Sequence, residues 1–150
     1  MKKSFSILSI FTLLIFSNLT INSCGSREDT VSCFPNAPIS VILNLNLAAY
    51  YDLNNSGGWK YIDEQSSGTR GLIVVRGAGN IFKIYDRNAP HICPDSNTTL
   101  EVKDGITIVC PKDNAKWILF TGQPTAVANV PPKTYLYNYD SASNVLNIYY

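Results

Sequence analysis

The chain has 150 residues, with 12 lysines and arginines, 11 aspartates and glutamates and a single histidine, which gives a net charge of +1. This balance excludes the concentrated basic surface that nucleic-acid binding requires. One histidine excludes every metal site that needs two imidazole ligands, and it disfavours hydrolytic triads. No other set of residues supplies a nucleophile, a base and an oxyanion donor together, so we expect neither a nucleic-acid partner nor an enzyme.

The first 24 residues have the pattern of an export signal. Two lysines at positions 2 and 3 precede an apolar run over residues 7–16, as in a secretory signal peptide. The run is too short to span a bilayer comfortably. The segment Ile-Asn-Ser-Cys at 21–24 resembles a bacterial lipobox, whose cysteine is lipidated and becomes the mature N-terminus. The alternative is an ordinary cleaved signal that leaves Cys24 as a plain thiol.

We therefore expect a signal peptide over residues 1–23, lipidation of Cys24 and a polar tether over residues 24–36. Cleavage removes Lys2 and Lys3, so 12 minus 2 leaves 10 basic residues against 11 acidic ones. With a mature charge near −1, the expected membrane attachment depends on the acyl chains and not on charge. The expected location is the bacterial cell envelope, as a periplasmic or outer-membrane lipoprotein.

Residues 37–150 have the pattern of one all-β domain. Apolar residues alternate with polar ones over residues 39–47, which predicts a strand with one buried face. A single helical turn is expected at 48–53, and Asp104-Gly105 predicts a type I′ hairpin. Many short strands separated by Gly, Pro and Asn predict a sandwich or small barrel. The further strands are expected at residues 72–76, 81–85, 99–103, 106–110, 116–120, 134–139 and 145–149.

Two segments carry the most specific motif: Ala-Pro-His-Ile-Cys at 89–93 and Cys-Pro-Lys-Asp at 110–113. They resemble the two cluster-binding loops of a Rieske iron–sulfur domain. A Rieske centre needs Cys-x-His in one loop and Cys-x-x-His in the other, so that two thiolates hold one iron and two imidazoles hold the other. In this frame the chain keeps one ligand in each loop. The retained ligands are His91 and Cys110, and the replaced positions are Ala89 and Asp113.

The resemblance runs in consistent order from Gly71 to the C-terminus. Lys-Trp-Ile-Leu-Phe at 116–120 and Thr-Gly-Gln-Pro at 121–124 are similar to the family's aromatic strand and T-G-x-P turn, and residues 132–135 are similar to the start of its final hairpin. The resemblance implies a Rieske-like antiparallel sandwich of short strands over residues 37–150, with a degenerate cluster site.

If Cys24 is acylated, three cysteines remain in an oxidising compartment: Cys33, Cys93 and Cys110. Exported proteins tend to pair their thiols, and three thiols allow three pairings with one left over. The resemblance places the two loops face to face and so implies a Cys93–Cys110 disulfide, with Cys33 free. The family's disulfide-forming variants place their extra cysteines near Cys93 and at Lys112, so this pairing would depart from them.

A metal is the alternative to that disulfide. The four groups His91, Cys93, Cys110 and Asp113 could hold an unusual [2Fe–2S] cluster, although a carboxylate is a hard donor that suits such clusters poorly. Zinc accepts all four groups, but both thiols would have to be reduced and deprotonated. We favour the disulfide, with no cofactor.

These expectations define two candidate functions. The favoured one is an envelope-anchored, Rieske-like lipoprotein that acts as a non-enzymatic binding or structural module. The alternative is an electron-transfer protein carrying an unusual [2Fe–2S] cluster. The expected partner is the membrane, through the lipid anchor, and the sequence identifies no protein or redox partner.

Overall fold

The computed structural model describes residues 30–150; the expected signal peptide, Cys24 and the first part of the expected tether lie outside these residues. Within residues 30–150 the chain forms ten strands and one 3₁₀ helix, and all strand pairs are antiparallel. The all-β, antiparallel prediction is confirmed. The elements are β1 (Ser40–Asn44), η1 (Ala48–Asn54), β2 (Trp59–Ile62), β3 (Leu72–Arg76), β4 (Phe82–Asp86), β5 (Glu101–Lys103), β6 (Thr107–Val109), β7 (Lys116–Ile118), β8 (Pro124–Ala126), β9 (Leu136–Asp140) and β10 (Val145–Tyr149).

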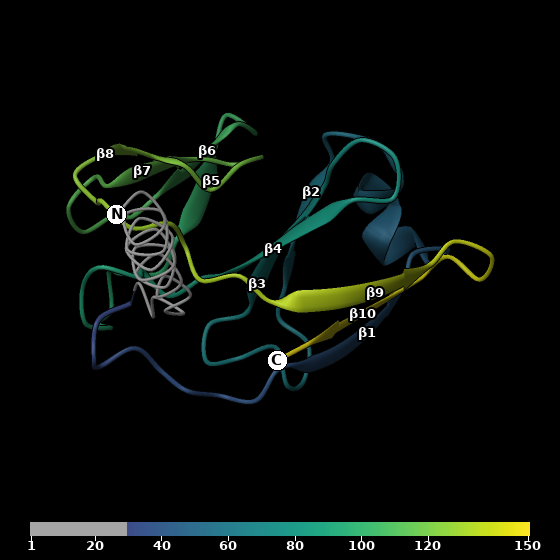
Figure 1. Cartoon of the computed structure of the whole chain (residues 1–150), viewed down its shortest axis with the longest axis horizontal. Helices are drawn as coiled ribbons and strands as arrows, with labels where there is room; N and C mark the ends of the chain where they lie inside the picture. Colours follow the sequence, from purple (N-terminus) through teal and green to yellow (C-terminus); the bar gives the residue numbers. More distant parts are fainter. Residues whose placement is uncertain (1–29) are drawn as a thin grey trace, which may run out of the picture.

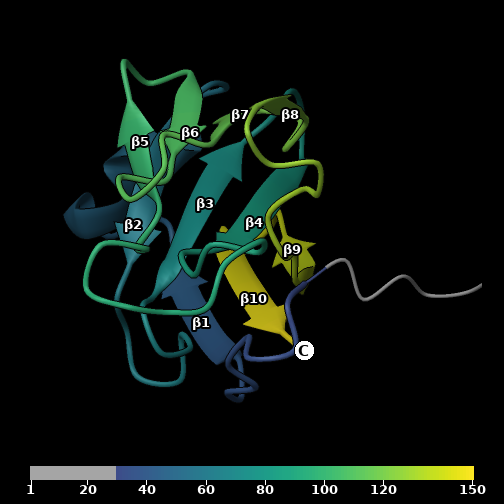
Figure 2. The same ribbon diagram turned by 90° about the vertical axis from the view of Figure 1, so that its left-hand side faces the viewer.

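The strands form three sheets. Their strand orders are β1-β10-β9, β2-β3-β4 and β5-β6-β7-β8. Figure 1 shows the four-stranded sheet at one end of the molecule and the β9–β10 turn at the other, with the sheet β2-β3-β4 between them. Figure 2 shows β3 and β4 between the sheet β1-β10-β9 and the sheet β5–β8. The sheet β2-β3-β4 is therefore the central layer.

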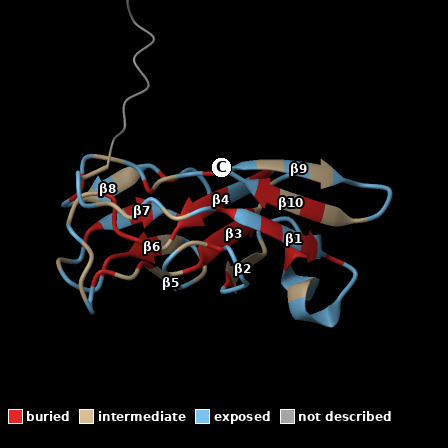
Figure 3. Ribbon diagram, turned by 90° about the horizontal axis from the view of Figure 1, so that it is seen from below, coloured by how far each residue is buried: buried red, intermediate tan, exposed pale blue. Residues whose placement is uncertain are grey.

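The central sheet is buried on both faces because each face belongs to a different hydrophobic core. Successive side chains of a strand point to opposite faces. Leu72 and Val74 of β3 accordingly join the core shared with β1 and β10, whereas Ile73 and Val75 join the core shared with β6 and β7. All four side chains are fully buried, which explains why β3 is a continuous apolar run and not an alternating one. Figure 3 shows this burial along β3.

The strand predictions agree with most of these elements. The strands at 72–76 and 145–149 have the predicted bounds, and the helical turn at 48–53 is the 3₁₀ helix η1. Asp104 and Gly105 have φ values of 54° and 67°, as a type I′ turn requires. Two short strands, β2 and β8, were not predicted.

Two loops leave the strands at the same end of the four-stranded sheet: the first loop (residues 87–100) joins β4 to β5, and the second loop (residues 110–115) joins β6 to β7. The start of the first loop is fixed by Asp86, the last residue of β4, which is 2% exposed. Its carboxylate accepts hydrogen bonds from the backbone N–H of Asn88 (2.7 Å) and the hydroxyl of Tyr135 (2.5 Å). No helix within residues 30–150 is long and apolar enough to cross a membrane.

Candidate functional site

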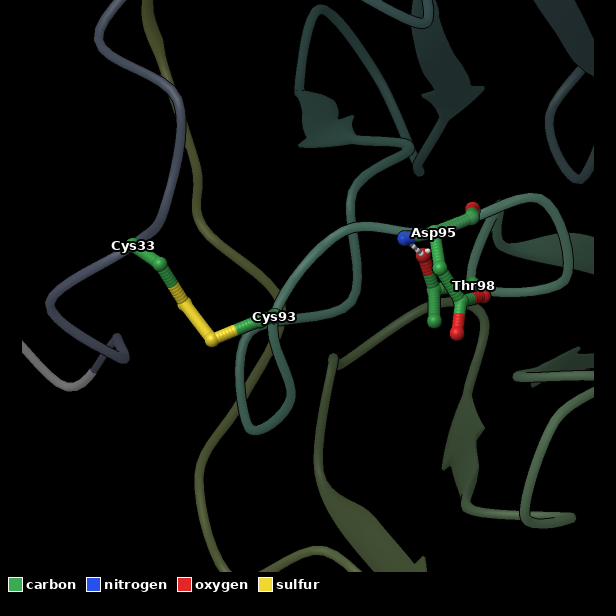
Figure 4. Close-up of a disulfide and its surroundings, with 4 residues drawn as sticks. All are labelled: Cys33, Cys93, Asp95 and Thr98. Carbon is green, nitrogen blue, oxygen red and sulfur yellow. Dashed lines mark hydrogen bonds between the residues drawn. A yellow bond between two sulfur atoms is a disulfide. The ribbon is translucent and has the colours of Figure 1, made fainter.

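The first loop is fixed to the central layer by Arg70, which lies just before β3. Its guanidinium donates one hydrogen bond to Thr99 Oγ1 and another to the carbonyl oxygen of Asp95, both at 2.5 Å. Within the loop, the Asp95 N–H donates to Thr98 Oγ1 at 2.8 Å (Figure 4). These bonds hold the backbone of the loop in one conformation and set the direction of its side chains.

The two loops meet through a direct bond between His91 and Asp113. The distance from His91 Nε2 to Asp113 Oδ2 is 2.6 Å, and the side chains are 14% and 26% exposed. The imidazole lies edge-on to the buried ring of Trp117, with 5.5 Å between the ring centroids. The structure thus confirms that the two motif loops face each other. The bond joins His91, a retained ligand position, to Asp113, a replaced one.

Asp113 is the centre of this contact because its carboxylate accepts hydrogen bonds from two groups. Besides His91, the backbone N–H of Ala115 donates to Oδ1 at 3.1 Å. Burial alone would raise the pKa of Asp113, but these hydrogen bonds outweigh it and the net pKa lies below the usual value. An ionised carboxylate only accepts hydrogen bonds, so Nε2 of His91 is the donor. We call this arrangement the Asp113 clasp.

A second bond joins the loops at Lys112 and Asp95, whose charged groups form an ion pair. The hydrogen bond from Lys112 is the main reason that the pKa of Asp95 is lowered. An ion pair thus joins the two loops beside the His91–Asp113 bond.

The expected disulfide between Cys93 and Cys110 is wrong. Cys93 pairs instead with Cys33, which lies ahead of β1, with a Cα–Cα distance of 5.5 Å (Figure 4). Cys110 is the free cysteine of the described residues, and it is fully buried. The physical reason is side-chain direction: Cys110 points into the core beside β6 and β7, whereas Cys93 lies on the exposed surface.

The ligand set His91, Cys93, Cys110 and Asp113 is also wrong as a metal site. The disulfide uses Cys93, and His91 and Asp113 bond to each other. Within residues 30–150, no three His, Cys, Asp or Glu side chains are grouped so that they could hold a metal ion. The set predicted for zinc or an unusual cluster is therefore not assembled.

The residues of the two loops do not fit a Rieske cluster. Ala89 is 1% exposed and packs in the core where the first thiolate would stand, and it offers no ligand atom. Cys110 supplies the thiol of the second loop, and its side chain is fully buried in the core beside β6 and β7. Only His91 keeps a free nitrogen, because its Nδ1 is buried without a hydrogen-bond partner among the described residues.

Comparisons with known proteins give likenesses to solved structures alone. No family model and no curated protein matches the chain. The chain is similar to the ferredoxin of carbazole 1,9a-dioxygenase from Nocardioides aromaticivorans IC177, with 19% identity, a TM-score of 0.43, and coverage of 76% of this chain and 98% of that one. It is also similar to a chain in the complex of reduced oxygenase and oxidised ferredoxin in carbazole 1,9a-dioxygenase, with 17% identity, a TM-score of 0.43, and coverage of 77% and 94%. Likenesses of this size assign no family, cofactor or partner to this chain.

Three residues that shape the site were not singled out from the sequence: Arg70, Asp95 and Cys33 as the partner of Cys93. Arg70 and Asp95 lie in stretches without a motif, and their role depends on the three-dimensional path of the first loop. The signal for Cys33 was the odd number of cysteines, which left its pairing open.

Peptide mapping under non-reducing conditions should recover Cys33 and Cys93 in one cross-linked peptide, with Cys110 alkylated only after unfolding. Replacing Cys33 with Ser should lower the free energy of unfolding by about 4 kcal/mol, the chain-entropy value for a cross-link across 60 residues. Cys93→Ser should cause the same loss. Recovery of a Cys93–Cys110 peptide would contradict the structure.

Asp113→Asn should lower the free energy of unfolding at neutral pH by about 1–2 kcal/mol, since the charged acceptor of the clasp is lost. The folded-state pKa of Asp113 lies below the usual value for an aspartate. Its contribution is therefore fully present above that value and is lost as the pH falls through the folded-state pKa.

Urea unfolding at neutral and acidic pH measures this difference. The matched control is Asp104→Asn, in the β5–β6 turn, because Asp104 is exposed and both Asp and Asn suit its φ of 54°. Equal effects of the two substitutions at neutral pH, or an Asp113→Asn effect that grows in acid, would refute the clasp.

Proposed function

We propose that this chain is an envelope-anchored lipoprotein with a Rieske-like domain whose two loops are closed by protein bonds in place of a cluster. It serves as a non-enzymatic binding or structural module. The observation that carries the proposal is the Asp113 clasp: His91, one of the two retained ligand residues, donates a hydrogen bond to the carboxylate at the replaced position, with 2.6 Å between Nε2 and Asp113 Oδ2.

The Asp113 clasp supports a structural role for the loops because the groups that it bonds to each other cannot also serve as ligands for the two irons of a cluster. A cluster needs four soft or borderline ligands, and this site offers a methyl group at Ala89 and a carboxylate at Asp113 in place of two of them. Three bonds fix the loops without iron: the clasp, the Lys112–Asp95 pair and the Cys33–Cys93 disulfide. The first loop is thus fixed to the second loop on one side and to the N-terminal segment at Cys93.

The same contacts argue against catalysis at this site. The only histidine donates its Nε2–H to a carboxylate, and its other nitrogen, Nδ1, is buried, so a substrate cannot reach the lone pair that would act as a base. Cys110 is fully buried and its pKa is raised, and both features make it a poor nucleophile. What the site provides is a rigid pair of loops, which suits a module that presents a fixed surface to a partner.

Attachment to the envelope is the second part of the proposal, and it is supported by the N-terminal sequence. A basic start, a short apolar run and a lipobox-like Ile-Asn-Ser-Cys motif ending at Cys24 favour export and acylation. The Cys33–Cys93 disulfide agrees with an oxidising compartment, where such bonds persist.

Protein isolated anaerobically from its native envelope fraction should be colourless and contain far less than one iron, zinc or sulfide per chain. Cys110→Ser should leave the visible spectrum unchanged and affect stability alone, because the thiol holds no metal. Near-stoichiometric iron and sulfide, with visible absorption that Cys110→Ser removes, would overturn the proposal and make the chain an electron carrier.

A further inference from the structure

The N-terminal segment is attached to the first loop well before the chain reaches β1. The backbone N–H of Val31 donates to the carbonyl oxygen of Pro90 at 2.9 Å, and two residues later Cys33 forms the disulfide with Cys93. In Figure 1 the described part of this segment starts beside the first loop and runs along one side of the molecule to β1. Residues 31–34, expected as part of the tether, are thus bonded to the first loop.

This attachment shortens the tether. From Cys24 to Val31 is seven residues, which reach at most about 25 Å when fully extended. If the segment were free as far as Ile39, the first residue paired in the sheet region, fifteen residues would reach about 54 Å. The disulfide and the Val31 bond therefore halve the distance that the domain can move from an acyl chain on Cys24.

We propose that one side of the domain, the anchor face, rests on the bilayer surface when Cys24 is acylated. The anchor face consists of residues 31–34 with Lys133 and Tyr150. The inference rests on the lipid anchor of the proposed function and adds the orientation of the domain. The occupant of the face is the phospholipid headgroup layer, because the end of the short tether lies at this face and nowhere else.

The side chains of the anchor face have the chemistry of a membrane interface. The ammonium of Lys133 lies 5.2 Å from the ring centroid of Phe34 and 4.4 Å from that of Tyr150. Tyr150 is 66% exposed, and its ring also packs against Tyr135 at 5.6 Å. Aromatic rings with a polar group, and lysines with a long apolar stem, are the side chains that prefer the headgroup layer.

The turn between β9 and β10 has the opposite character. It is formed by exposed polar residues, and hydrogen bonds from Ala142 and Ser143 lower the pKa of Asp140, so its carboxylate is ionised. The turn lies at the far end of β10 from Tyr150 (Figure 1). The proposed orientation directs the anchor face to the lipid and leaves this turn toward solvent and any protein partner.

Quenching of an introduced tryptophan by brominated lipids tests the orientation. The lipidated protein, expressed as the full chain, is placed on vesicles of phosphatidylethanolamine and phosphatidylglycerol with brominated acyl chains. Tyr150→Trp should be quenched at least about twofold more than the matched control Ser143→Trp in the β9–β10 turn, since interfacial groups lie about 5–10 Å into the headgroup region. Trp59 and Trp117 contribute the same background to both variants.

Reduction of the exposed Cys33–Cys93 disulfide on the vesicles should then remove the difference while the protein stays bound. Equal quenching of the two variants before reduction, on protein that floats with the vesicles, would overturn the orientation alone. Failure of the wild-type protein to float, with Cys24→Ser behaving identically, would overturn the lipid anchor itself. The two failures are therefore distinguishable.

Discussion

The structure depends on a central sheet that is buried on both faces. β3 contributes alternate side chains to two different cores, so a change in its register would disrupt both at once. β4 pairs with β3 along its whole length and leads into the first loop. The position of that loop is thus fixed by the best-packed part of the molecule. Arg70, just ahead of β3, then binds the loop's backbone, which links the loop to the same sheet.

In the proposed function, the Asp113 clasp takes the place that a cluster has in a Rieske domain. In a Rieske domain the metal holds two loops together through four ligand bonds. Here a carboxylate of the second loop accepts a hydrogen bond from an imidazole of the first loop, while a backbone N–H of its own loop orients it, and it is most effective when ionised. The neighbouring residues agree with this proposal. Ala89 needs no partner, and Lys112 forms an ion pair with Asp95. Cys93 bonds to Cys33 of the N-terminal segment and not to the second loop.

The sequence predicted those parts of the fold where the residue pattern is compatible with a single kind of secondary structure or turn. The alternation before η1 and the Asp104-Gly105 turn were correct for that reason. β2 was missed because Trp59 and Tyr61 face one core while Ile62 faces the other, so the strand has no simple alternation of apolar and polar residues. The resemblance correctly placed the loops opposite each other, as the His91–Asp113 bond shows. It could not give the disulfide, because pairing depends on which way Cys110 points at the end of β6, and motif spacing does not contain that direction.

A crystal structure of the envelope-isolated protein, with anomalous diffraction data at the iron and zinc edges, tests the central claim most directly. The clasp predicts His91 Nε2 within hydrogen-bond distance of Asp113 Oδ2, Cys33 bonded to Cys93, and no anomalous peak between the two loops. An iron or zinc peak bonded to Cys110 or to Nδ1 of His91, with the imidazole turned away from Asp113, would contradict it and restore a metal centre to the site.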